Sequence, residues 1–283
     1  MVHKHAISTS RYYKYGGYYT LLYDMRSYCT KIHKGCIQDT SDIAGGNMIK
    51  IDNLSFSYRK ASRRNLDKLH VEFPNGTINM IIGKNGSGKT TLFDLIANVI
   101  KRPPEIQGVP DEKEMIYQLQ GLLFPLTLKA RDLFRFFLYS DYSNRIQIKT
   151  EPYVDEDMSV SEVELVQRVW DMDFGQLSVG ERRYLCILAI TLMKRKLYIF
   201  DEPLAGIDPE MRQHILKRIE KLALNNECTV LVSNHHLQDL ENIHCIIHLI
   251  HQGRVTFSGS YTEFIQNGDG NNPDQAFLNQ VKS

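Results

Sequence analysis

The stretch Gly83-Lys84-Asn85-Gly86-Ser87-Gly88-Lys89-Thr90 matches the pattern G-x-x-x-x-G-K-[ST] at every required position. Glycines let successive backbone N–H groups turn inward around a phosphate chain, where a Cβ would obstruct them. The lysine adds a mobile positive charge at the terminal phosphates, and the Thr90 hydroxyl can hold Mg²⁺. These eight residues, with Thr91 directly after them, are therefore predicted to bind the phosphates of a nucleotide.

The segments on either side of this loop favour the same interpretation. Residues 78–82 form a short apolar run, interrupted by Asn79, that predicts a buried strand. Residues 91–100 have the apolar spacing of a helix and end before Pro103. A helix that begins at the loop points its positive end at the bound anion. Strand, glycine-rich loop and helix in this order disfavour the alternative of a chance glycine-rich turn.

Length and composition indicate one large globular domain, with or without an appendage. The 283 residues are 42% hydrophobic and carry a net charge of +1, which argues against a nucleic-acid binder driven by bulk charge. No apolar run reaches the roughly 18 residues that a membrane span needs, and the N-terminus does not resemble a secretory signal. Five scattered cysteines are typical of reduced thiols in a cytosolic protein.

The first 47 residues differ from the rest of the chain. They are rich in tyrosine and basic residues and show little periodicity, so we expect a poorly ordered or loosely docked extension. Cys29, His33 and Cys36, together with His3 or His5, raise the alternative of a zinc site. Their spacing matches no common zinc pattern, so the extension is the favoured interpretation.

Two acidic residues follow a second apolar run. Residues 197–200 predict a buried strand, and Asp201 and Glu202 come directly after it. Ligands of a parallel α/β sheet lie at the carboxyl ends of its strands. Asp201 would therefore lie beside Mg²⁺, and Glu202 is placed to polarise an attacking water. The alternative is a pair of solvated carboxylates.

Four further segments occur in a fixed order around these motifs, namely Gln120 in Ile116-Tyr117-Gln118-Leu119-Gln120, then Leu177-Ser178-Val179-Gly180-Glu181, then Leu204-Ala205-Gly206-Ile207-Asp208, and an apolar run ending in Ser233-Asn234-His235. With the phosphate loop, they resemble the nucleotide-binding subunit of ABC transporters from about Met48 to about Phe264. The resemblance implies an α/β fold: a P-loop NTPase core with a mostly parallel sheet, a small antiparallel β subdomain and an inserted helical subdomain.

The resemblance also implies roles for residues around the nucleotide. Tyr58 would stack on adenine, unless it is an ordinary strand tyrosine. Gln120 would touch Mg²⁺ or the attacking water, with Gln118 as the second choice. His235 would contact the γ-phosphate and orient the water, with His236 as the second choice and a surface histidine as the alternative.

A second group of residues would act across a dimer. Ser178 and Gly180 would cap the γ-phosphate of an ATP molecule held by the opposite subunit, and Asp208 would lie at the dimer seam. Ser178 can also be the N-cap of the following helix, and both roles can hold together because a helix N-terminus is an anion site.

The sequence departs from the family pattern in two places. In the usual signature L-S-G-G-Q, Val179 here replaces the first glycine and Glu181 replaces the glutamine. We expect a site that can still bind the phosphate. Val179 adds bulk at the dimer seam and Glu181 adds charge near the phosphates, which predicts slower turnover or pairing with a different subunit. The interval from Lys89 to Gln120 is short, which predicts a trimmed accessory sheet with residues 105–108 as its remnant.

The resemblance assigns the ATP-binding domain to residues 48–265, with the helical subdomain at about 121–180 and a tail at 266–283. It implies a Mg-dependent ATPase that dimerises around ATP with an identical or different ATP-binding subunit. That ATPase would power a separate transmembrane permease subunit from the cytoplasmic side, on the inner face of the cell membrane. The alternatives are a soluble ABC-type ATPase in DNA repair or translation, disfavoured by the single phosphate loop, and a weakly hydrolysing regulator, disfavoured by Glu202 and His235.

Overall fold

Six strands form the sheet that carries the phosphate loop. The computed structural model describes residues 48–59, 64–121, 124–140, 151–225, 228–234, 237–268 and 272–281, all within one compact unit that spans residues 45–283. The strand order is β5-β6-β7-β3-β8-β9, and every neighbouring pair is parallel except β8 and β9. The strands are β3 (Ile78–Ile82), β5 (Met115–Gln118), β6 (Leu197–Phe200), β7 (Thr229–Ser233), β8 (Cys245–His251) and β9 (Arg254–Ser260).

The central strands are apolar along their whole length because both faces of the sheet are covered. Ile78, Met80 and Ile82 of β3 belong to the core beneath the helices, whereas Ile81 belongs to a second core on the opposite face. The side chains of β6 and β7 alternate between these two cores in the same way. A strand that is buried on both faces reads as a continuous hydrophobic run, which is the pattern seen in residues 78–82 and 197–200.

Asn79, the polar residue inside β3, is fully buried and hydrogen-bonded. Its amide donates to the Pro74 carbonyl at 2.9 Å and to the Val230 carbonyl at 3.2 Å. Its side-chain oxygen lies 3.3 Å from Nε2 of His248, whose pKa burial lowers to about 4. Because these partners replace water, the asparagine is tolerated inside the strand.

A smaller sheet of three strands lies beside the phosphate loop. β1 (Ile49–Phe56) pairs antiparallel with β2 (Leu66–Phe73) on one side and with the two-residue β4 (Ile106–Gln107) on the other. The core of this region includes side chains from β1, β2 and α2 (Lys89–Ile96), the helix that follows the loop. The shortness of β4 agrees with the trimmed accessory sheet predicted from the sequence.

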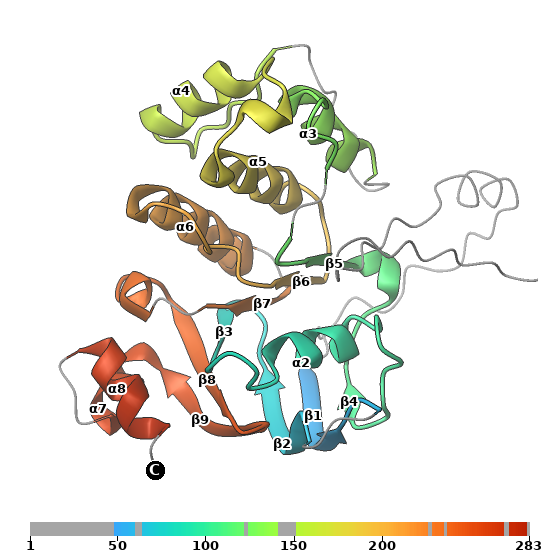
Figure 1. Cartoon of the computed structure of the whole chain (residues 1–283), viewed down its shortest axis with the longest axis vertical. Coiled ribbons are helices and arrows are strands. Elements are labelled where there is room, and N and C mark those ends of the chain that lie inside the picture. The colour runs from blue at the N-terminus through green and yellow to red at the C-terminus, as the bar shows by residue number, and fades with distance from the viewer. Residues whose placement is uncertain are drawn as a thin grey trace, which may run out of the picture. The chain divides into compact units, whose positions relative to one another are not determined.

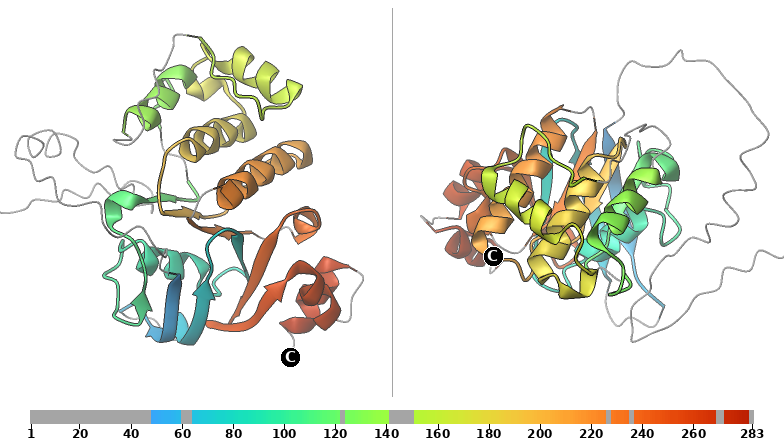
Figure 2. Two further views of the ribbon diagram at one scale, coloured as in Figure 1. Left: turned by 180° about the vertical axis from the view of Figure 1, so that it is seen from behind. Right: turned by 90° about the horizontal axis from the view of Figure 1, so that it is seen from above.

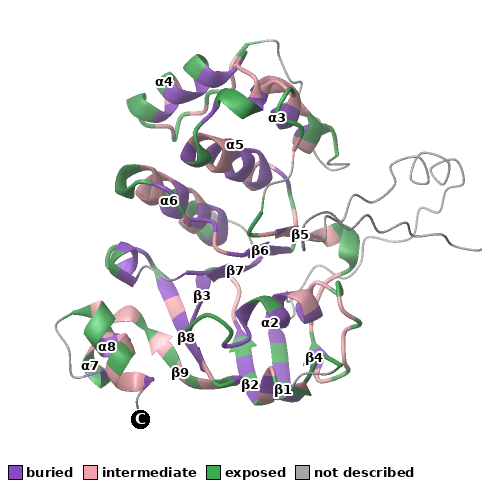
Figure 3. Ribbon diagram, in the orientation of Figure 1, coloured by how far each residue is buried: buried purple, intermediate pink, exposed green. Residues whose placement is uncertain are grey.

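The large sheet has α2 on one face, and further helices cover its opposite face, as Figures 1 and 2 show. α6 packs against β3 and β7, and α5 packs against α6 on one side and α3 on the other. Figure 3 shows that most of α5 is buried between its neighbours, while α4 is more exposed. The helices are α3 (Ala130–Tyr139), α4 (Val160–Val169), α5 (Val179–Thr191), α6 (Pro209–Asn225), α7 (Tyr261–Asn267) and α8 (Pro273–Gln280), with 3₁₀ turns at Glu112–Glu114, Phe174–Gln176 and Leu237–Leu240.

This architecture confirms the predicted fold class: a mostly parallel sheet, a small antiparallel sheet and an inserted group of helices. One boundary differs from the sequence prediction. The helix expected to reach residue 100 ends at Ile96, with Ala97 as its C-cap and Asn98 in the left-handed conformation at φ 59°. Asparagine tolerates that conformation, so the helix ends before the prolines are reached.

Across the described part of the chain, no helix combines the length and the apolar character needed to cross a membrane. The tyrosine-rich residues 1–47 lie outside the described residues, and so does the zinc site considered for Cys29, His33 and Cys36.

Candidate nucleotide-binding site

The phosphate loop connects β3 to α2, and its glycines are required by close contacts. A Cβ at Gly83 would lie 2.4 Å from the Ile250 carbonyl oxygen and 2.6 Å from Ser87 Oγ. Gly88 is the N-cap of α2 and adopts φ 113°, where a Cβ would lie 2.7 Å from the Asn65 carbonyl oxygen. No other residue fits these two positions without moving the backbone.

Two polar side chains are buried inside this loop. The Lys89 ammonium donates to the Gly83 carbonyl at 2.8 Å and to the Lys84 carbonyl at 3.4 Å. Burial lowers the pKa of Lys89, against the opposing effect of the Glu202 and Asp201 carboxylates. The Ser87 hydroxyl is also buried and has no hydrogen-bond partner among the described residues. A buried lysine and an unpaired hydroxyl at a helix N-terminus fit the oxygens of a phosphate chain.

Asp201 lies at the carboxyl end of β6. Its carboxylate forms hydrogen bonds with the phosphate loop and with the end of the neighbouring strand, β7. Its Oδ2 accepts a hydrogen bond from Thr90 Oγ1 at 2.9 Å, and its Oδ1 accepts one from Ser233 Oγ at 2.6 Å. Burial raises the pKa of Asp201, and the bonds from Ser233 and Thr90 oppose that rise. The predicted pair Thr90 and Asp201 is thus adjacent in the fold, and its hydroxyl and carboxylate oxygens are ligands that Mg²⁺ prefers.

Glu202 is held by contacts from three separate elements. Its backbone N–H donates to Ser233 Oγ at 2.8 Å, and its backbone adopts φ 50°, a conformation that is uncommon outside glycine. Its carboxylate accepts a hydrogen bond from the Gln120 amide. Arg183 of α5 donates to the Glu202 carbonyl and, at 3.0 Å, to the Gln120 carbonyl. Gln120 and Glu202, 82 positions apart in the chain, therefore lie together.

The second choice for the glutamine, Gln118, occupies a different environment. It ends β5, is 5% exposed and donates to the Leu119 carbonyl at 2.6 Å. Gln120, in contrast, is exposed and reaches the catalytic-base candidate Glu202. The structure therefore favours Gln120 as the glutamine that faces the site.

Tyr58 lies just beyond the end of β1 and beside the phosphate loop. Thr91 Oγ1 donates to its hydroxyl at 3.5 Å, and its ring meets Phe56 edge-on at 5.1 Å. The side chain is 42% exposed, which leaves ring surface for a base to stack on. His235 and His236 lie outside the described residues. The residue before them, Asn234, is buried and its N–H donates to the Ile81 carbonyl at 3.2 Å.

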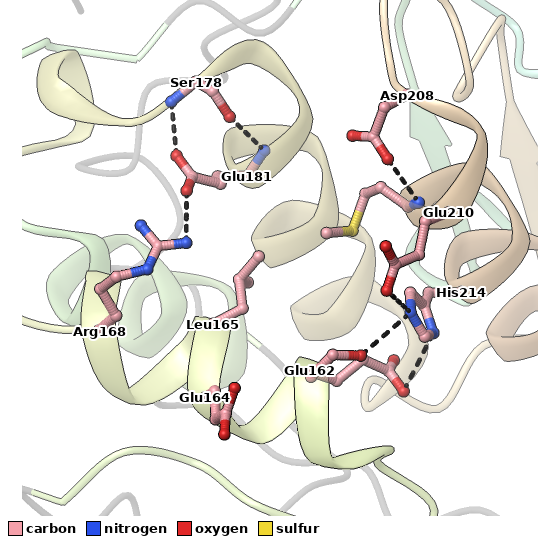
Figure 4. A pocket seen from close by; sticks show the side chains of 11 residues that line it. Glu162, Glu164, Leu165, Arg168, Ser178, Glu181, Asp208, Glu210 and His214 are labelled. Atoms are coloured by element: carbon pink, nitrogen blue, oxygen red, sulfur yellow. Dashed lines mark hydrogen bonds and ion pairs between the residues drawn. The ribbon is translucent and has the colours of Figure 1, made fainter.

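Ser178 is the N-cap of α5, as one of the two interpretations predicted. Its hydroxyl accepts a hydrogen bond from the Glu181 N–H at 3.2 Å, and its own N–H donates to the Glu181 carboxylate at 2.7 Å. Gly180 is buried, and a Cβ built on it would lie 3.8 Å from Asp208 Oδ2. Ser178 and Asp208 border the same pocket of about 360 Å³, shown in Figure 4. The predicted cross-dimer residues therefore form one cluster.

Three residues that organise this site belong to no motif recognised in the sequence: Ser233, Arg183 and Arg168. Ser233 could have been identified, because it ends the strand next to β6 and so reaches the same edge of the sheet as Asp201. The role of Arg183 depends on how α5 faces β6, and no local pattern reveals that. Arg168 of α4 pairs with Glu181 at 2.7 Å, a contact between separate helices that the sequence does not indicate.

A partly buried carboxyl group lies on the helix that follows the phosphate loop. Asp94, on α2, accepts a hydrogen bond from the Tyr117 hydroxyl at 3.2 Å. Burial raises the pKa of Asp94 to about 6, against the effect of the bond from Tyr117, and the Asp201 charge adds to the rise. The loop therefore has two carboxyl groups near it whose ionisation is disfavoured by burial.

Comparisons with known proteins agree with this geometry. Residues 66–205 match the family model described as ABC transporter. The energy-coupling factor transporter ATP-binding protein EcfA2 of Clostridium acetobutylicum is 27% identical over 232 residues, which are 76% of this chain and 80% of that protein. The EcfA1 protein of Thermotoga maritima is 26% identical over 232 residues, covering 77% of this chain and 85% of that protein.

A solved structure shares the fold. The structure titled as the ATP binding subunit of an ABC transporter superposes with a TM-score of 0.63 at 20% identity, covering 83% of this chain and 99% of that one. The family model spans the phosphate loop, the signature and the acidic strand whose contacts are described above. The chain therefore contains an ATP-binding domain of the kind that the ABC transporter family model describes.

Proposed function

We propose that this chain is the ATP-binding and hydrolysing subunit of a membrane transporter and that it dimerises around ATP. One observation carries the proposal: the sheet edge that holds the phosphate loop also brings together Thr90, Asp201, Glu202 and Gln120 through direct hydrogen bonds. An ABC ATP-binding domain binds ATP, and this arrangement adds the groups needed to hydrolyse it.

Each group in the arrangement has a chemical task. The backbone of residues 83–90 and the Lys89 ammonium neutralise the charge of the phosphates. Thr90 and Asp201 would hold Mg²⁺, which supplies further charge neutralisation on the phosphate oxygens. Glu202 accepts a proton from the attacking water, and Gln120 and His235 orient that water. Catalysis in such a site is mostly orientation and electrostatic stabilisation.

The signature half of the site would act on ATP held by a second subunit, which is either identical or different. The Ser178 oxygen is occupied by the Glu181 N–H, but its hydroxyl hydrogen takes no part in that bond. That hydrogen and the N–H groups at the start of α5 are therefore suited to donate to a phosphate from outside the chain. ATP bound between two subunits favours the closed dimer, and hydrolysis removes that preference.

A transmembrane permease subunit is the partner that this proposal requires. The relatives named EcfA1 and EcfA2 are ATP-binding proteins of energy-coupling factor transporters. On and near α3, the side chains of Leu126, Phe136 and Tyr139 are 60%, 42% and 73% exposed, which leaves apolar surface for a partner. The chain would then work at the cytoplasmic face of the membrane. The names of these relatives refer to transporters and not to DNA repair or translation.

The proposal is tested by purifying the tagged full-length chain from its native membranes in mild detergent. We expect a partner with several spanning helices and ATP hydrolysis that EDTA abolishes. A Glu202→Gln variant keeps the Gln120 contact geometry but lacks the base, so it should retain the partner and lose about 10²- to 10³-fold in hydrolysis. Glu241→Gln, an exposed site on another segment, is the control. Ribosomes or DNA in place of a membrane protein would overturn the proposal.

A further inference from the structure

The carboxylate of Glu181 is bound at the helix N-terminus that the signature uses. Its Oε2 accepts the Ser178 N–H at 2.7 Å, and its backbone N–H bonds the Ser178 hydroxyl oxygen at 3.2 Å. The ion pair with Arg168 joins its other carboxylate oxygen, Oε1, to the guanidinium at 2.7 Å. Burial alone would raise the pKa of Glu181, but the bonds from Ser178 and Arg168 outweigh it and lower the pKa, so the group is ionised at neutral pH.

An ionised glutamate at this position opposes the function of the helix end. A capping glutamate and a capping glutamine make the same pair of bonds to a serine N-cap, so the cap does not require a charge. The phosphate that Ser178 would receive is itself an anion, and like charges in a partly desolvated site repel. Some positive group must offset Glu181 before the signature can accept a phosphate.

The pocket beside the signature offers one guanidinium for that task. Figure 4 shows its lining residues: Arg168 points at Glu181, while His214 lies between Glu162 and Glu210 on the far side. Among the described residues that line this pocket, the acids are Glu162, Glu164, Glu181, Asp208 and Glu210, and Arg168 is the sole lysine or arginine. Without Arg168 the described lining of this pocket would contain five acids and no lysine or arginine, and the nearby Arg182 is directed at the Leu177 and Gly175 carbonyls.

We propose that Arg168 is a positioning residue of the signature half-site: its guanidinium neutralises Glu181, so that the carboxylate capping α5 does not repel the phosphate received by Ser178. This inference rests on the proposed function. Arg168 acts through Glu181 and makes no contact with the phosphate itself. The glutamate in the signature and the arginine on α4 form one functional pair, in which the glutamate opposes phosphate binding when the arginine is absent.

A double-mutant cycle separates this role from direct phosphate binding. The assembled ATP-binding subunits, purified with their partner and carrying Glu202→Gln to stop hydrolysis, are titrated with ATP while subunit closure is followed by fluorescence. Arg168→Gln should raise the ATP concentration for half-maximal closure by about fivefold, because the Glu181 carboxylate, without its ion-pair partner, repels the incoming phosphate. Glu181→Gln alone and the double variant should stay within about twofold of the parent, since neither leaves an uncompensated negative charge at the start of α5.

Two controls keep the outcome specific. Lys221→Gln removes a cation from an exposed ion pair with Asp157 on another surface and should change nothing. Raising the salt concentration should shrink the Arg168→Gln defect, because screening weakens repulsion between exposed charges.

Arg168→Gln curves equal to the parent, or an equal defect with and without Glu181, would overturn this inference alone. The second of these results would assign Arg168 to direct phosphate contact. A parent complex that binds no ATP, or never closes with it, would overturn the proposed function and this inference with it.

Discussion

The phosphate-loop half of the site is held together by bonds within this chain, whereas the signature half directs its donors outward. Thr90, Asp201, Ser233 and Glu202 form a continuous chain of hydrogen bonds at the edge of the parallel sheet. The Ser178 hydroxyl, in contrast, bonds only to Glu181 of its own capping box within the part of the chain that the structure describes. This difference supports the proposal that the site is shared by two subunits.

The two halves also differ in the direction in which they shift the pKa of a carboxyl group. Burial raises the pKa of Asp94 and Asp201 beside the phosphate loop, while hydrogen bonds and Arg168 lower the pKa of Glu181 at the signature. Carboxylates near the loop are therefore kept partly desolvated, next to the place where a cation would bind. The carboxylate at the signature is ionised and must be compensated by an arginine.

Lys89→Ala should break the phosphate-loop half and give the largest effect. Removing the buried ammonium takes away the positive charge at the terminal phosphates, so hydrolysis should fall by about 10³-fold and nucleotide affinity should also drop. Phosphate release and isothermal titration measure the two effects. Lys101→Ala, an exposed lysine just beyond α2, is the control and should retain full activity.

Ser178→Ala should break the signature half while leaving nucleotide binding by the isolated chain unchanged. Hydrolysis by the dimer should fall by about 10²-fold, because a phosphate donor is lost, and the lost cap should also lower stability by about 1 kcal/mol. Ser260 forms the same capping box with Glu263 on α7, so Ser260→Ala provides a matched control for the cap. If both variants lose hydrolysis equally, the signature serine has a structural role alone.

The places of Thr90, Asp201 and Glu202 in the fold could be predicted from the sequence, because they depend on local motifs and on parallel strands ending at one edge. The positions of Asp201 and Glu202 follow from a strand pattern, and so could the position of Ser233. Arg183 and Arg168 could not be predicted, because each joins two elements whose relative orientation is set by packing of the helical region. Helix ends were also hard to place, as α2 shows: a left-handed asparagine, Asn98, ends it before the prolines.

Asp94→Asn tests whether burial raises the pKa of a carboxyl group beside the phosphate loop, in contrast to the lowered pKa of Glu181 at the signature. The pKa of Asp94 is raised to about 6 in the folded chain, so its ionisation disfavours folding as the pH rises from about 4 through 6. Asparagine keeps an oxygen that can accept the Tyr117 bond and carries no charge. Allowing for partial exposure, the variant should gain about 1 kcal/mol of unfolding free energy at pH 7 and lose that gain near pH 4.

Urea denaturation at a series of pH values measures this effect. Asp111→Asn, at an exposed turn, is the control and should stay within about 0.5 kcal/mol at every pH. A gain for Asp94→Asn that is independent of pH would show that its charge is not the cause.

Val179→Gly tests whether the bulk of the Val179 side chain at the signature slows hydrolysis, and its expected effect is the smallest of the four variants. The Val179 side chain is 53% exposed at the first position of α5 and lies beside Gly206, so its bulk faces outward from the signature. Removing it should raise the hydrolysis rate by about twofold, offset in stability by the roughly 1 kcal/mol that glycine costs a helix. An unchanged rate would remove any role for the valine at the seam.

The most direct test of the shared site is a structure of the Glu202→Gln variant with Mg-ATP bound. We predict that Ser178 Oγ of one subunit lies about 3 Å from a γ-phosphate oxygen of the nucleotide held by residues 83–90 of the other subunit. A structure in which ATP is enclosed by one chain alone, with Ser178 facing solvent in every subunit, would contradict the account.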